Sequence, residues 1–310
     1  MGGNIFAGKT TSIKCEYIQP TLNAYYAELK KLFPKKSKIF DKFEPLGSVG
    51  KKKVSGDIDL GVSVDDLLGK NITDKSIKEW DIDPQAVTKT FEELTKRART
   101  SSPDQLRRKA FLKHLTLHIN THAPTLYCDE KKVSDGNIFG LYPQIDEHGQ
   151  QVGSGVQIDW MVGDLKWLRF SYHSAAYPED SNVKGLHRTQ LMLSAFQVAN
   201  MAFNHVNGVK DKATGQVIAT APDRALSVLG NKLGFKIKQT DAEDYYKLHT
   251  LLKAKMKPTD YSSLINVYFK ILDSTRADIP DNLQDEWRKR QLMLGLTGKF
   301  LPDTSALKAK

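Results

Sequence analysis

The chain has 310 residues, of which 40% are hydrophobic and 26% are charged, and this composition is ordinary for a folded globular protein. No apolar run approaches the roughly 18 residues that a membrane-spanning helix needs. Two cysteines, Cys15 and Cys128, exclude a disulfide scaffold. We therefore expect no membrane association and a reducing, cytoplasmic location.

Lysine and arginine outnumber aspartate and glutamate by 46 to 36, so the formal net charge is +10. Such an excess attracts polyanions, which include nucleic acids, nucleotides and anionic membrane surfaces. Solubility alone also explains a charge of this size. The charge therefore favours an anionic partner without identifying it.

The first 62 residues are predicted to form one helix and two strands. Pro20 to Phe33 places its apolar residues on one helical face and is followed by Pro34, which ends the helix. Phe40 to Leu46 and Asp57 to Val62 are the strand candidates. A glycine- and lysine-rich connection, GSVGKKK at residues 47–53, lies between them.

The middle of the chain is predicted to contain two helices followed by two strands. Pro84 to Arg99 and Pro103 to Ile119 are the helices, and the second has Ser102 in position to cap it. Ile138 to Ile145 and Val156 to Val162 are the strands, joined by a polar turn.

Beyond Gly163 the pattern becomes helical. The predicted helices are Leu186–His205, Pro222–Leu233, Ala242–Lys255, Tyr261–Leu272 and Leu283–Leu294. We therefore expect an α+β fold with a mixed β-sheet, flanking helices and a C-terminal helical lobe. The expected domains are residues 1–185, with a long helix-containing insertion at 61–155, and residues 186–310.

Asp57 and Asp59 are two residues apart on a predicted strand, so their carboxylates share one face of it. Two adjacent carboxylates repel, and one pKa rises unless something compensates the charge. Mg²⁺ is the natural compensation, because it prefers carboxylate oxygens and substrate phosphates. A solvated strand face carrying two unrelated aspartates is the alternative, since this short motif is common.

A phosphate-binding loop is predicted directly before these aspartates. Gly47 permits close backbone approach, and the Ser48 hydroxyl with neighbouring N–H groups can hold a phosphate. The run Lys51–Lys53 adds positive charge beside this loop. These neighbours favour a nucleotide-binding role over an unrelated pair of acids.

A third acid is available on a later strand. Asp159 lies in the middle of the apolar run Val156–Val162, so three carboxylates converge if this strand pairs beside the Asp57 strand. Asp146 and Asp164 are alternative third acids, although neither lies centrally in an apolar strand.

Three segments together resemble the DNA polymerase β-like nucleotidyltransferase superfamily: Leu46-Gly47-Ser48, Ser55-Gly56-Asp57-Ile58-Asp59-Leu60 and Ile158-Asp159-Trp160. That superfamily has an apolar residue before Gly-Ser, then Asp-x-Asp on a strand, then a third acid on a later strand. The resemblance covers only about residues 45–62 and 155–162 and assigns no subfamily. The long segment 61–155 departs from the short link of small members, which bears on the choice of third acid.

The resemblance implies an enzyme that transfers a nucleoside monophosphate from an NTP, such as ATP, to a hydroxyl and releases pyrophosphate. Asp57 and Asp59 would bridge two Mg²⁺ ions, for which Mn²⁺ is a possible substitute, and Asp159 would complete the catalytic site. Gly47 and Ser48 would hold the terminal phosphates.

A second basic set opens the C-terminal helical domain. Lys184 and Arg188 lie one helical turn apart and could grip a triphosphate at the helix N-terminus. A solvated helix start is the alternative interpretation.

The basic charge favours RNA as the acceptor, so template-independent addition to an RNA 3′ end is the leading hypothesis. Synthesis of cyclic or linear oligonucleotide signals from NTPs alone is one alternative. A non-catalytic nucleic-acid-binding protein on the same scaffold is another. The choice of NTP, the acceptor and the oligomeric state are not predicted.

Two other motifs are interpreted as structural. Residues 3–10, GNIFAGKT, match the P-loop pattern, but no strand precedes them as a P-loop requires. His114, His118 and His122 recur at helical spacing near Cys128, and a polar helix face explains them better than a metal site does.

Overall fold

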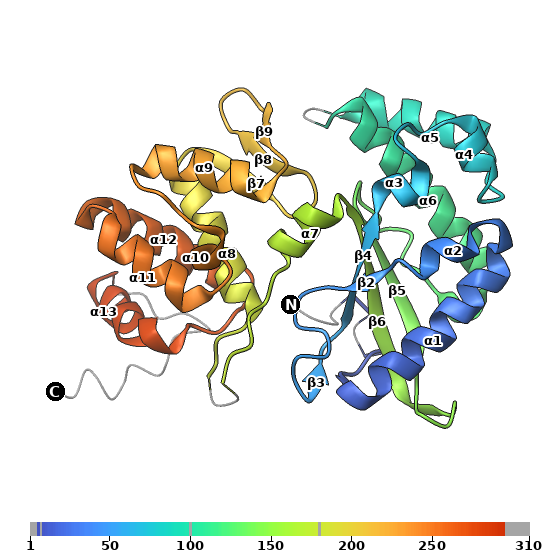
Figure 1. Ribbon diagram of the computed structural model, residues 1–310, viewed down its shortest axis with the longest axis horizontal. Helices are drawn as coiled ribbons and strands as arrows, with labels where there is room; N and C mark the ends of the chain where they lie inside the picture. The colour runs from blue at the N-terminus through green and yellow to red at the C-terminus, as the bar shows by residue number, and fades with distance from the viewer. Residues whose placement is uncertain (1–4, 7, 99–100, 179–180, 295–310) are drawn as a thin grey trace. The chain divides into compact units, whose positions relative to one another are not determined.

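The computed structural model describes residues 5–6, 8–98, 101–178 and 181–294, and these form helices and strands in a mixed α/β arrangement (Figure 1). The predicted fold class is confirmed. The chain divides into two compact units. Among the described residues, the first unit contains those up to Ser171 together with His205–Asn207, and the second contains those from Tyr172 to Asn204 and those from Gly208 onward. This division lies before the boundary that we predicted near residue 185.

A four-stranded sheet forms the centre of the first unit. Its order is β2 (Glu44–Pro45), β4 (Ile58–Ser63), β6 (Gln151–Gly163) and β5 (Asn137–Ile145). Strands β4 and β6 run parallel, whereas the two outer pairs are antiparallel. The strands predicted near residues 57–62, 138–145 and 156–162 are therefore confirmed, and β6 begins earlier than expected.

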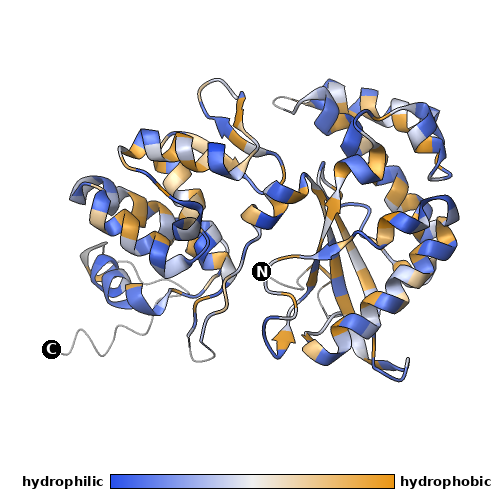
Figure 2. Ribbon diagram, in the orientation of Figure 1, coloured by the Kyte–Doolittle hydropathy of each residue, from blue (hydrophilic) through white to orange (hydrophobic). Residues whose placement is uncertain are grey.

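Alternation along β4 and β6 separates an apolar face of the sheet from a polar one. Ile58, Leu60, Ile158 and Trp160 are fully buried. Helix α1 (Cys15–Leu32) packs against β5, and the Trp160 indole N–H donates a hydrogen bond to its Tyr25 hydroxyl at 2.8 Å. Figure 2 shows the hydrophobic colour concentrated along the strands of this sheet.

Two predictions near the N-terminal end of this unit were wrong in detail. Helix α1 begins at Cys15, so Pro20 lies inside the helix, where it removes one backbone hydrogen bond. The predicted strand Phe40–Leu46 begins as helix α2 (Ser37–Phe40), and only Glu44–Pro45 pair in the sheet. Because Pro45 has no N–H, it suits a short edge strand.

The insertion between β4 and β5 is helical. It contains α3 (Val64–Leu68), α4 (Asp74–Lys78), α5 (Pro84–Arg97) and α6 (Pro103–His122), so the two predicted helices are confirmed with shifted ends. A 3₁₀ turn at Pro124–Leu126 follows α6, as another at Pro34–Lys36 follows α1. Strand β5 and the start of β6 belong to the central sheet, which corrects the expected extent of the insertion at 61–155.

An aromatic cluster joins the insertion to the sheet. Trp80 is fully buried, its ring lies 5.1 Å from the ring of Phe33, and its indole N–H donates to the Leu67 carbonyl at 2.9 Å. Phe40 contacts both Trp80 and Trp160, at 6.1 and 6.4 Å between ring centroids. The insertion therefore shares the core of the sheet.

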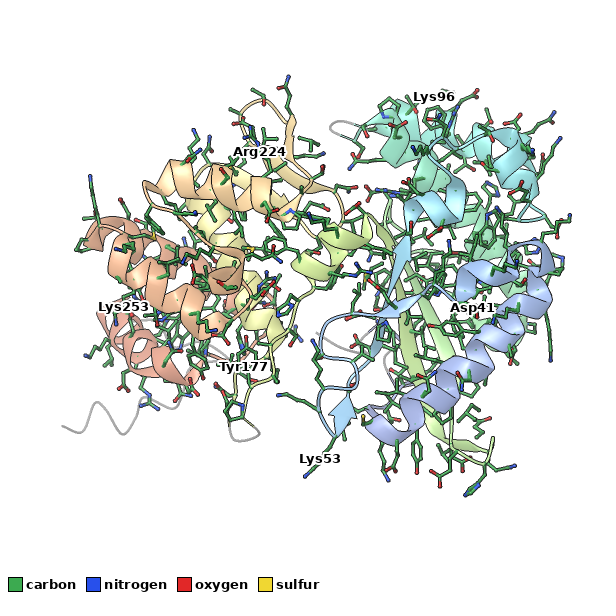
Figure 3. All side chains as sticks on the ribbon, viewed as in Figure 1. Asp41, Lys53, Lys96, Tyr177, Arg224 and Lys253 are labelled. Carbon is green, nitrogen blue, oxygen red and sulfur yellow. The ribbon has the colours of Figure 1, made fainter. Side chains whose placement is uncertain are left out.

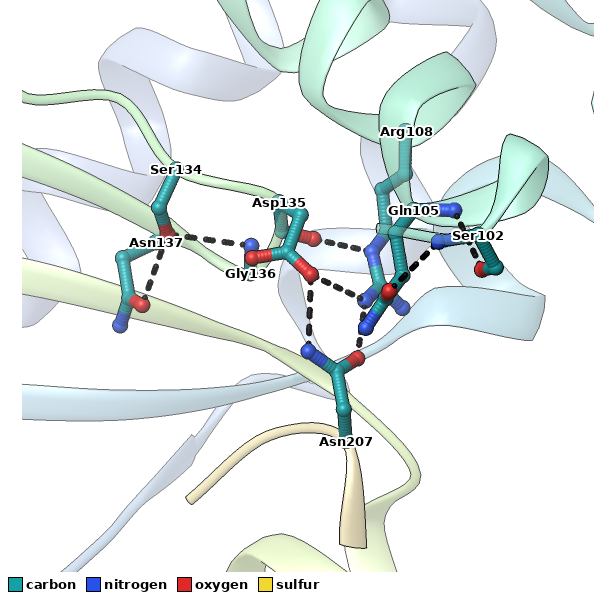
Figure 4. Close-up of polar contacts among 8 residues, drawn as sticks. All are labelled: Ser102, Gln105, Arg108, Ser134, Asp135, Gly136, Asn137 and Asn207. Atoms are coloured by element: carbon teal, nitrogen blue, oxygen red, sulfur yellow. Dashed lines mark hydrogen bonds and ion pairs between the residues drawn. The ribbon is translucent and has the colours of Figure 1, made fainter. Parts of the chain in front are cut away.

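Residues His205–Asn207 pack within the first unit through a polar network (Figure 4). Arg108 of α6 donates to the Asp135 carbonyl, and it also donates to Asn207 Oδ1 at 2.6 Å. Asn207 Nδ2 donates in turn to Asp135 Oδ2 at 2.7 Å. Beside this network, a Cβ placed on Gly136 would lie 2.5 Å from Val206 Cγ1.

The second unit combines helices with a small antiparallel sheet. Its strands are β7 (Met201–Asn204), β8 (Gly208–Asp211) and β9 (Val217–Ala219). The predicted helix Leu186–His205 was therefore wrong at its end: α8 (Gly185–Val198) stops before Asn200, which has φ of 59°. The expected C-terminal helical lobe therefore also carries this small sheet, which the sequence analysis did not predict.

Of the remaining helices that the structure describes in the second unit, four follow the prediction closely, and α10 (Gln239–Ala242) was not predicted. The four are α9 (Pro222–Leu233), α11 (Tyr245–Lys255), α12 (Pro258–Ser274) and α13 (Gln284–Leu294), with a 3₁₀ turn at Asp281–Leu283. In the first unit, α7 (Leu165–Ser171) follows β6. None of the helices among the described residues is both long and apolar enough to cross a membrane.

Candidate metal centre

Three aspartates meet at the polar face of the central sheet. Asp59 of β4 is the direct cross-strand partner of Asp159 of β6, and Asp57 lies immediately before β4. Each contributes a carboxylate oxygen, and these three oxygens all lie within 4.8 Å of one another. The structure thus brings together the three acids that the sequence analysis selected.

The two alternative third acids lie in other local structures. Asp146 accepts hydrogen bonds from the N–H groups of His148 and Gln150 and so shapes the β5–β6 turn. Asp164 is exposed and accepts the Trp167 N–H at 2.8 Å, which caps α7. Neither belongs to the acidic cluster found among the described residues.

The electrostatics of the cluster disfavour three negative charges together. Burial, followed by the charge of Asp57, raises the pKa of Asp59. Burial and then the charge of Asp59 raise the pKa of Asp159, while its hydrogen bond from Gln157 lowers it. A divalent cation among these oxygens would remove the repulsion and favour the ionised carboxylates.

The orientation of Asp159 fits such a cation. Only 3% of the residue is exposed, and Gln157 Nε2 donates to its Oδ2 at 2.7 Å. The other oxygen, Oδ1, is buried and has no hydrogen-bond partner among the described residues. A buried carboxylate oxygen without a partner is costly, and a hard cation with oxygen ligands would satisfy it.

The predicted phosphate loop begins beside this cluster. The Leu46 N–H donates to the Asp59 carbonyl at 2.9 Å, so the chain turns into the loop at the level of Asp59. Gly47 has φ of 64°, a left-handed conformation that glycine adopts without strain. Ser48 is exposed, as is Lys53 at the far end of the loop (Figure 3).

The second basic set lies in the other compact unit. Lys184 Nζ forms an exposed ion pair with Asp278 at 3.3 Å. Arg188 is fully buried, its Nε donates to the Ala242 carbonyl at 2.6 Å, and burial lowers its pKa to about 10. A role of Lys184 and Arg188 in binding a triphosphate stays a prediction.

The histidines of α6 have local partners. His114 Nε2 lies 2.8 Å from the Thr90 hydroxyl, and the rings of His118 and His122 stack at 4.2 Å between centroids. The nearby Cys128 thiol is buried and donates to the Leu126 carbonyl.

The segment that matches a P-loop pattern lies partly outside the described residues, since Gly3, Asn4 and Ala7 are not described. Its remaining residues form turns rather than a strand and helix, and Thr10 makes an isolated bridge to Gly155 of β6. This part of the chain therefore runs beside the strand that carries Asp159.

Sequence reasoning missed Gln157. It is 2% exposed and makes the hydrogen bond to Asp159 described above. The signal was available, because Gln157 precedes Asp159 by two residues on a strand and so shares its face. A polar residue inside an otherwise apolar strand could have been singled out on that ground.

Comparisons with known proteins give likenesses among solved structures alone. No protein-family model matches the chain, and no curated protein matches it. Among solved structures, polymerase beta of Leishmania infantum, in a ternary P/T complex, aligns with a TM-score of 0.37 and 12% sequence identity. The alignment covers 76% of this chain and 77% of that one.

Proposed function

We propose that the chain is a divalent-metal-dependent nucleotidyltransferase that transfers a nucleoside monophosphate from an NTP to the 3′ hydroxyl of RNA. The observation that carries this proposal is the cluster of Asp57, Asp59 and Asp159, whose oxygens lie within 4.8 Å of one another. The buried Oδ1 of Asp159, which has no hydrogen-bond partner among the described residues, also supports the proposal, because it is suited to bind a cation.

Each aspartate has a role in this proposal. Asp57 and Asp59 would hold two Mg²⁺ ions, and Asp159 would complete the coordination of one of them. When bound, such ions lower the pKa of the attacking hydroxyl and neutralise charge on the leaving pyrophosphate. The carboxylates thereby fix where the acceptor oxygen and the α-phosphate meet, which is the protein's main contribution.

The neighbouring loop would bind the rest of the nucleotide. Gly47 lets the backbone approach the phosphates closely, and the exposed Ser48 hydroxyl can donate to them. Lys53 adds positive charge at the end of the same loop.

The choice of RNA rests on the formal net charge of +10. A basic protein attracts nucleic acid and loses affinity as salt rises. The same charge is a poor match for a polycationic small-molecule acceptor.

The proposal is tested by incubating the protein with each labelled NTP, Mg²⁺ and an RNA oligonucleotide. We expect the RNA to lengthen without a template, and EDTA to stop the reaction. An RNA that ends in a 3′-deoxynucleotide should not be extended, because it lacks the acceptor hydroxyl. Product formed from NTPs alone would instead favour synthesis of oligonucleotide signals.

Charge-matched variants separate catalysis from binding. Asp57→Asn, Asp59→Asn and Asp159→Asn should each lose extension by at least about a hundredfold, while RNA binding persists. Asp164→Asn is the matched control, because asparagine also caps a helix and Asp164 lies outside the cluster. RNA extension that survives in Asp159→Asn but disappears in Asp164→Asn would contradict the assignment of the third acid.

A further inference from the structure

We infer that Gln157 is the positioning residue for Asp159, and that the backbone N–H of Ile5 sets the orientation of Gln157. This inference rests on the proposed function, since it concerns the same metal centre. Gln157 lies on β6 two residues before Asp159, and both side chains are buried, at 2% and 3% exposure.

The hydrogen bonds of Gln157 have a defined direction. Its Nε2 donates to Asp159 Oδ2 at 2.7 Å, and its Oε1 accepts the Ile5 N–H at 3.2 Å. The reversed amide would place an oxygen against a carboxylate and an NH₂ group against an N–H. The Ile5 N–H therefore selects the orientation in which the amide donates to Asp159.

This arrangement leaves one oxygen of Asp159 available. Because Oδ2 accepts from Gln157, the carboxylate is held with Oδ1 as its remaining ligand atom. Hydrogen bonds to a ligating carboxylate fix its orientation, and their loss commonly weakens metal binding by about ten- to a hundredfold. Gln157 acts here through Asp159 and is not itself a ligand in this inference.

The segment that carries Ile5 is anchored at several points along its length. Phe6 is buried and packs edge-on against Tyr127, at 5.9 Å between ring centroids. Farther along, Thr11 N–H donates to the Gly155 carbonyl of β6 at 3.0 Å. The segment then forms β1 (Ile13–Lys14), which pairs with β3 (Val54–Ser55), and only Gly56 separates β3 from Asp57.

A second buried glutamine holds the same segment without touching the cluster. Gln144 of β5 is 5% exposed, and its Nε2 donates to the Thr11 hydroxyl at 3.0 Å and to the Thr11 carbonyl at 3.3 Å. Gln144 therefore offers a matched control. Substitution of Gln144 would remove only hydrogen bonds to the segment, whereas substitution of Gln157 would also remove the hydrogen bond to Asp159.

The test is a titration of the purified full chain with Mn²⁺, in which electron paramagnetic resonance measures the free ion. Gln157→Met keeps the volume of the side chain but removes the amide, and we expect it to weaken Mn²⁺ binding by about tenfold. Gln144→Met should bind Mn²⁺ as the unaltered protein does. Circular dichroism and thermal unfolding verify that each variant is folded.

A backbone substitution tests the same inference independently. Ile5→Pro removes the N–H that orients Gln157, while Ile5→Ala retains it. We expect Ile5→Pro, but not Ile5→Ala, to weaken Mn²⁺ binding, and the Ile5→Pro effect to disappear in a Gln157→Met background. If Gln157→Met does not fold, the Ile5 pair of variants alone decides the question.

The outcomes distinguish the inference from the function on which it rests. Unchanged Mn²⁺ binding in folded Gln157→Met, or an equal loss in Gln144→Met, would overturn the positioning role and leave the metal centre intact. If the unaltered protein binds no Mn²⁺, both the metal centre and the role of Gln157 are overturned.

Discussion

Asp59 and Asp159 are direct partners in the parallel ladder of β4 and β6, although they come from distant parts of the chain. Their side chains share one face of the sheet because both strands alternate in the same register. Burial raises the pKa of both carboxyl groups, and a neighbouring charge adds to the effect, that of Asp57 at Asp59 and that of Asp59 at Asp159. The pairing that defines the candidate metal centre therefore lowers the stability of the metal-free protein.

The first prediction concerns this pairing and pH. A carboxyl whose pKa is higher in the folded state binds protons on folding, so stability is lost as pH rises from about 4 towards neutral and above. In EDTA, Asp59→Asn should weaken this dependence and raise the free energy of unfolding at pH 8 by about 1 kcal/mol or more. Urea unfolding at several pH values measures both effects.

The control for this experiment is Asp164→Asn, which should keep the dependence of the unaltered protein. Added Mg²⁺ should stabilise the unaltered protein and Asp164→Asn, but not Asp59→Asn. An unchanged pH dependence of stability in Asp59→Asn would show that the surroundings of Asp59 do not raise the pKa of its carboxyl group in the unaltered protein.

The second prediction concerns His249 of α11. Its Nε2 lies 2.8 Å from the Tyr261 hydroxyl, and its Nδ1 lies 3.2 Å from Asn282 Nδ2. Burial lowers the pKa of His249 to about 4, and the positive charge of Lys253 lowers it further. The charge of Glu286 raises this pKa by a smaller amount. In the unfolded state this histidine takes up a proton at a higher pH than in the folded state. Its contribution to the free energy of unfolding is therefore fully present above pH 6.5 and is lost as pH falls towards 4.

His249→Gln should remove much of this acid sensitivity, which amounts to at most about 3 kcal/mol. Denaturant unfolding followed by tryptophan fluorescence at pH 7, 6, 5 and 4 provides the measurement, because Trp287 packs in the same unit. The exposed His148 offers a matched control, and His148→Gln should behave as the unaltered protein. Equal acid sensitivity in both variants would count against the assignment.

The third prediction concerns Gly136 and Val206. A Cβ on Gly136 would lie within 3.0 Å of three Val206 side-chain atoms, so Gly136→Ala should cost about 1–3 kcal/mol. Val206→Ala removes the clashing methyl groups, and the double variant should recover part of that loss. Additive effects in the double-mutant cycle would show that the two side chains do not meet.

The fourth prediction concerns Gly47 at the start of the proposed phosphate loop. Gly47→Ala forces a side chain into φ of 64° and should destabilise the protein by about 1 kcal/mol. It should also weaken ATP binding several-fold, as measured by calorimetric titration. Gly149→Ala imposes similar strain at φ of 75° in the distant β5–β6 turn, so it should lower stability alone.

The sequence predicted helices most accurately where residues typical of a helix start and a helix end mark both ends. Helix α9 spans Pro222–Leu233 as predicted, because Pro222 occupies the first turn and Gly234 ends it in a left-handed conformation with φ of 83°. The end of the helix predicted at Leu186–His205 lacked such residues. Its apolar end, Met201–Phe203, suits either a helix or a strand, and β7 forms there.

Part of the candidate site could be predicted and part could not. The three aspartates stood out by residue type and spacing, since each falls at or beside an apolar strand. Their convergence required the parallel pairing of β4 and β6, which a sequence pattern does not specify. The contact between Ile5 and Gln157 was inaccessible, because a backbone N–H leaves no mark in the sequence.

The placement of the helical insertion between β4 and β5, ahead of β6, has a consequence for biosynthesis. On a ribosome, the first two acids emerge long before the third, and the parallel pairing cannot close until β6 has left the exit tunnel. Such non-local pairing slows folding. A growing polypeptide therefore lacks the third carboxylate of the candidate metal centre, and chains that terminate within the insertion should lack the proposed activity.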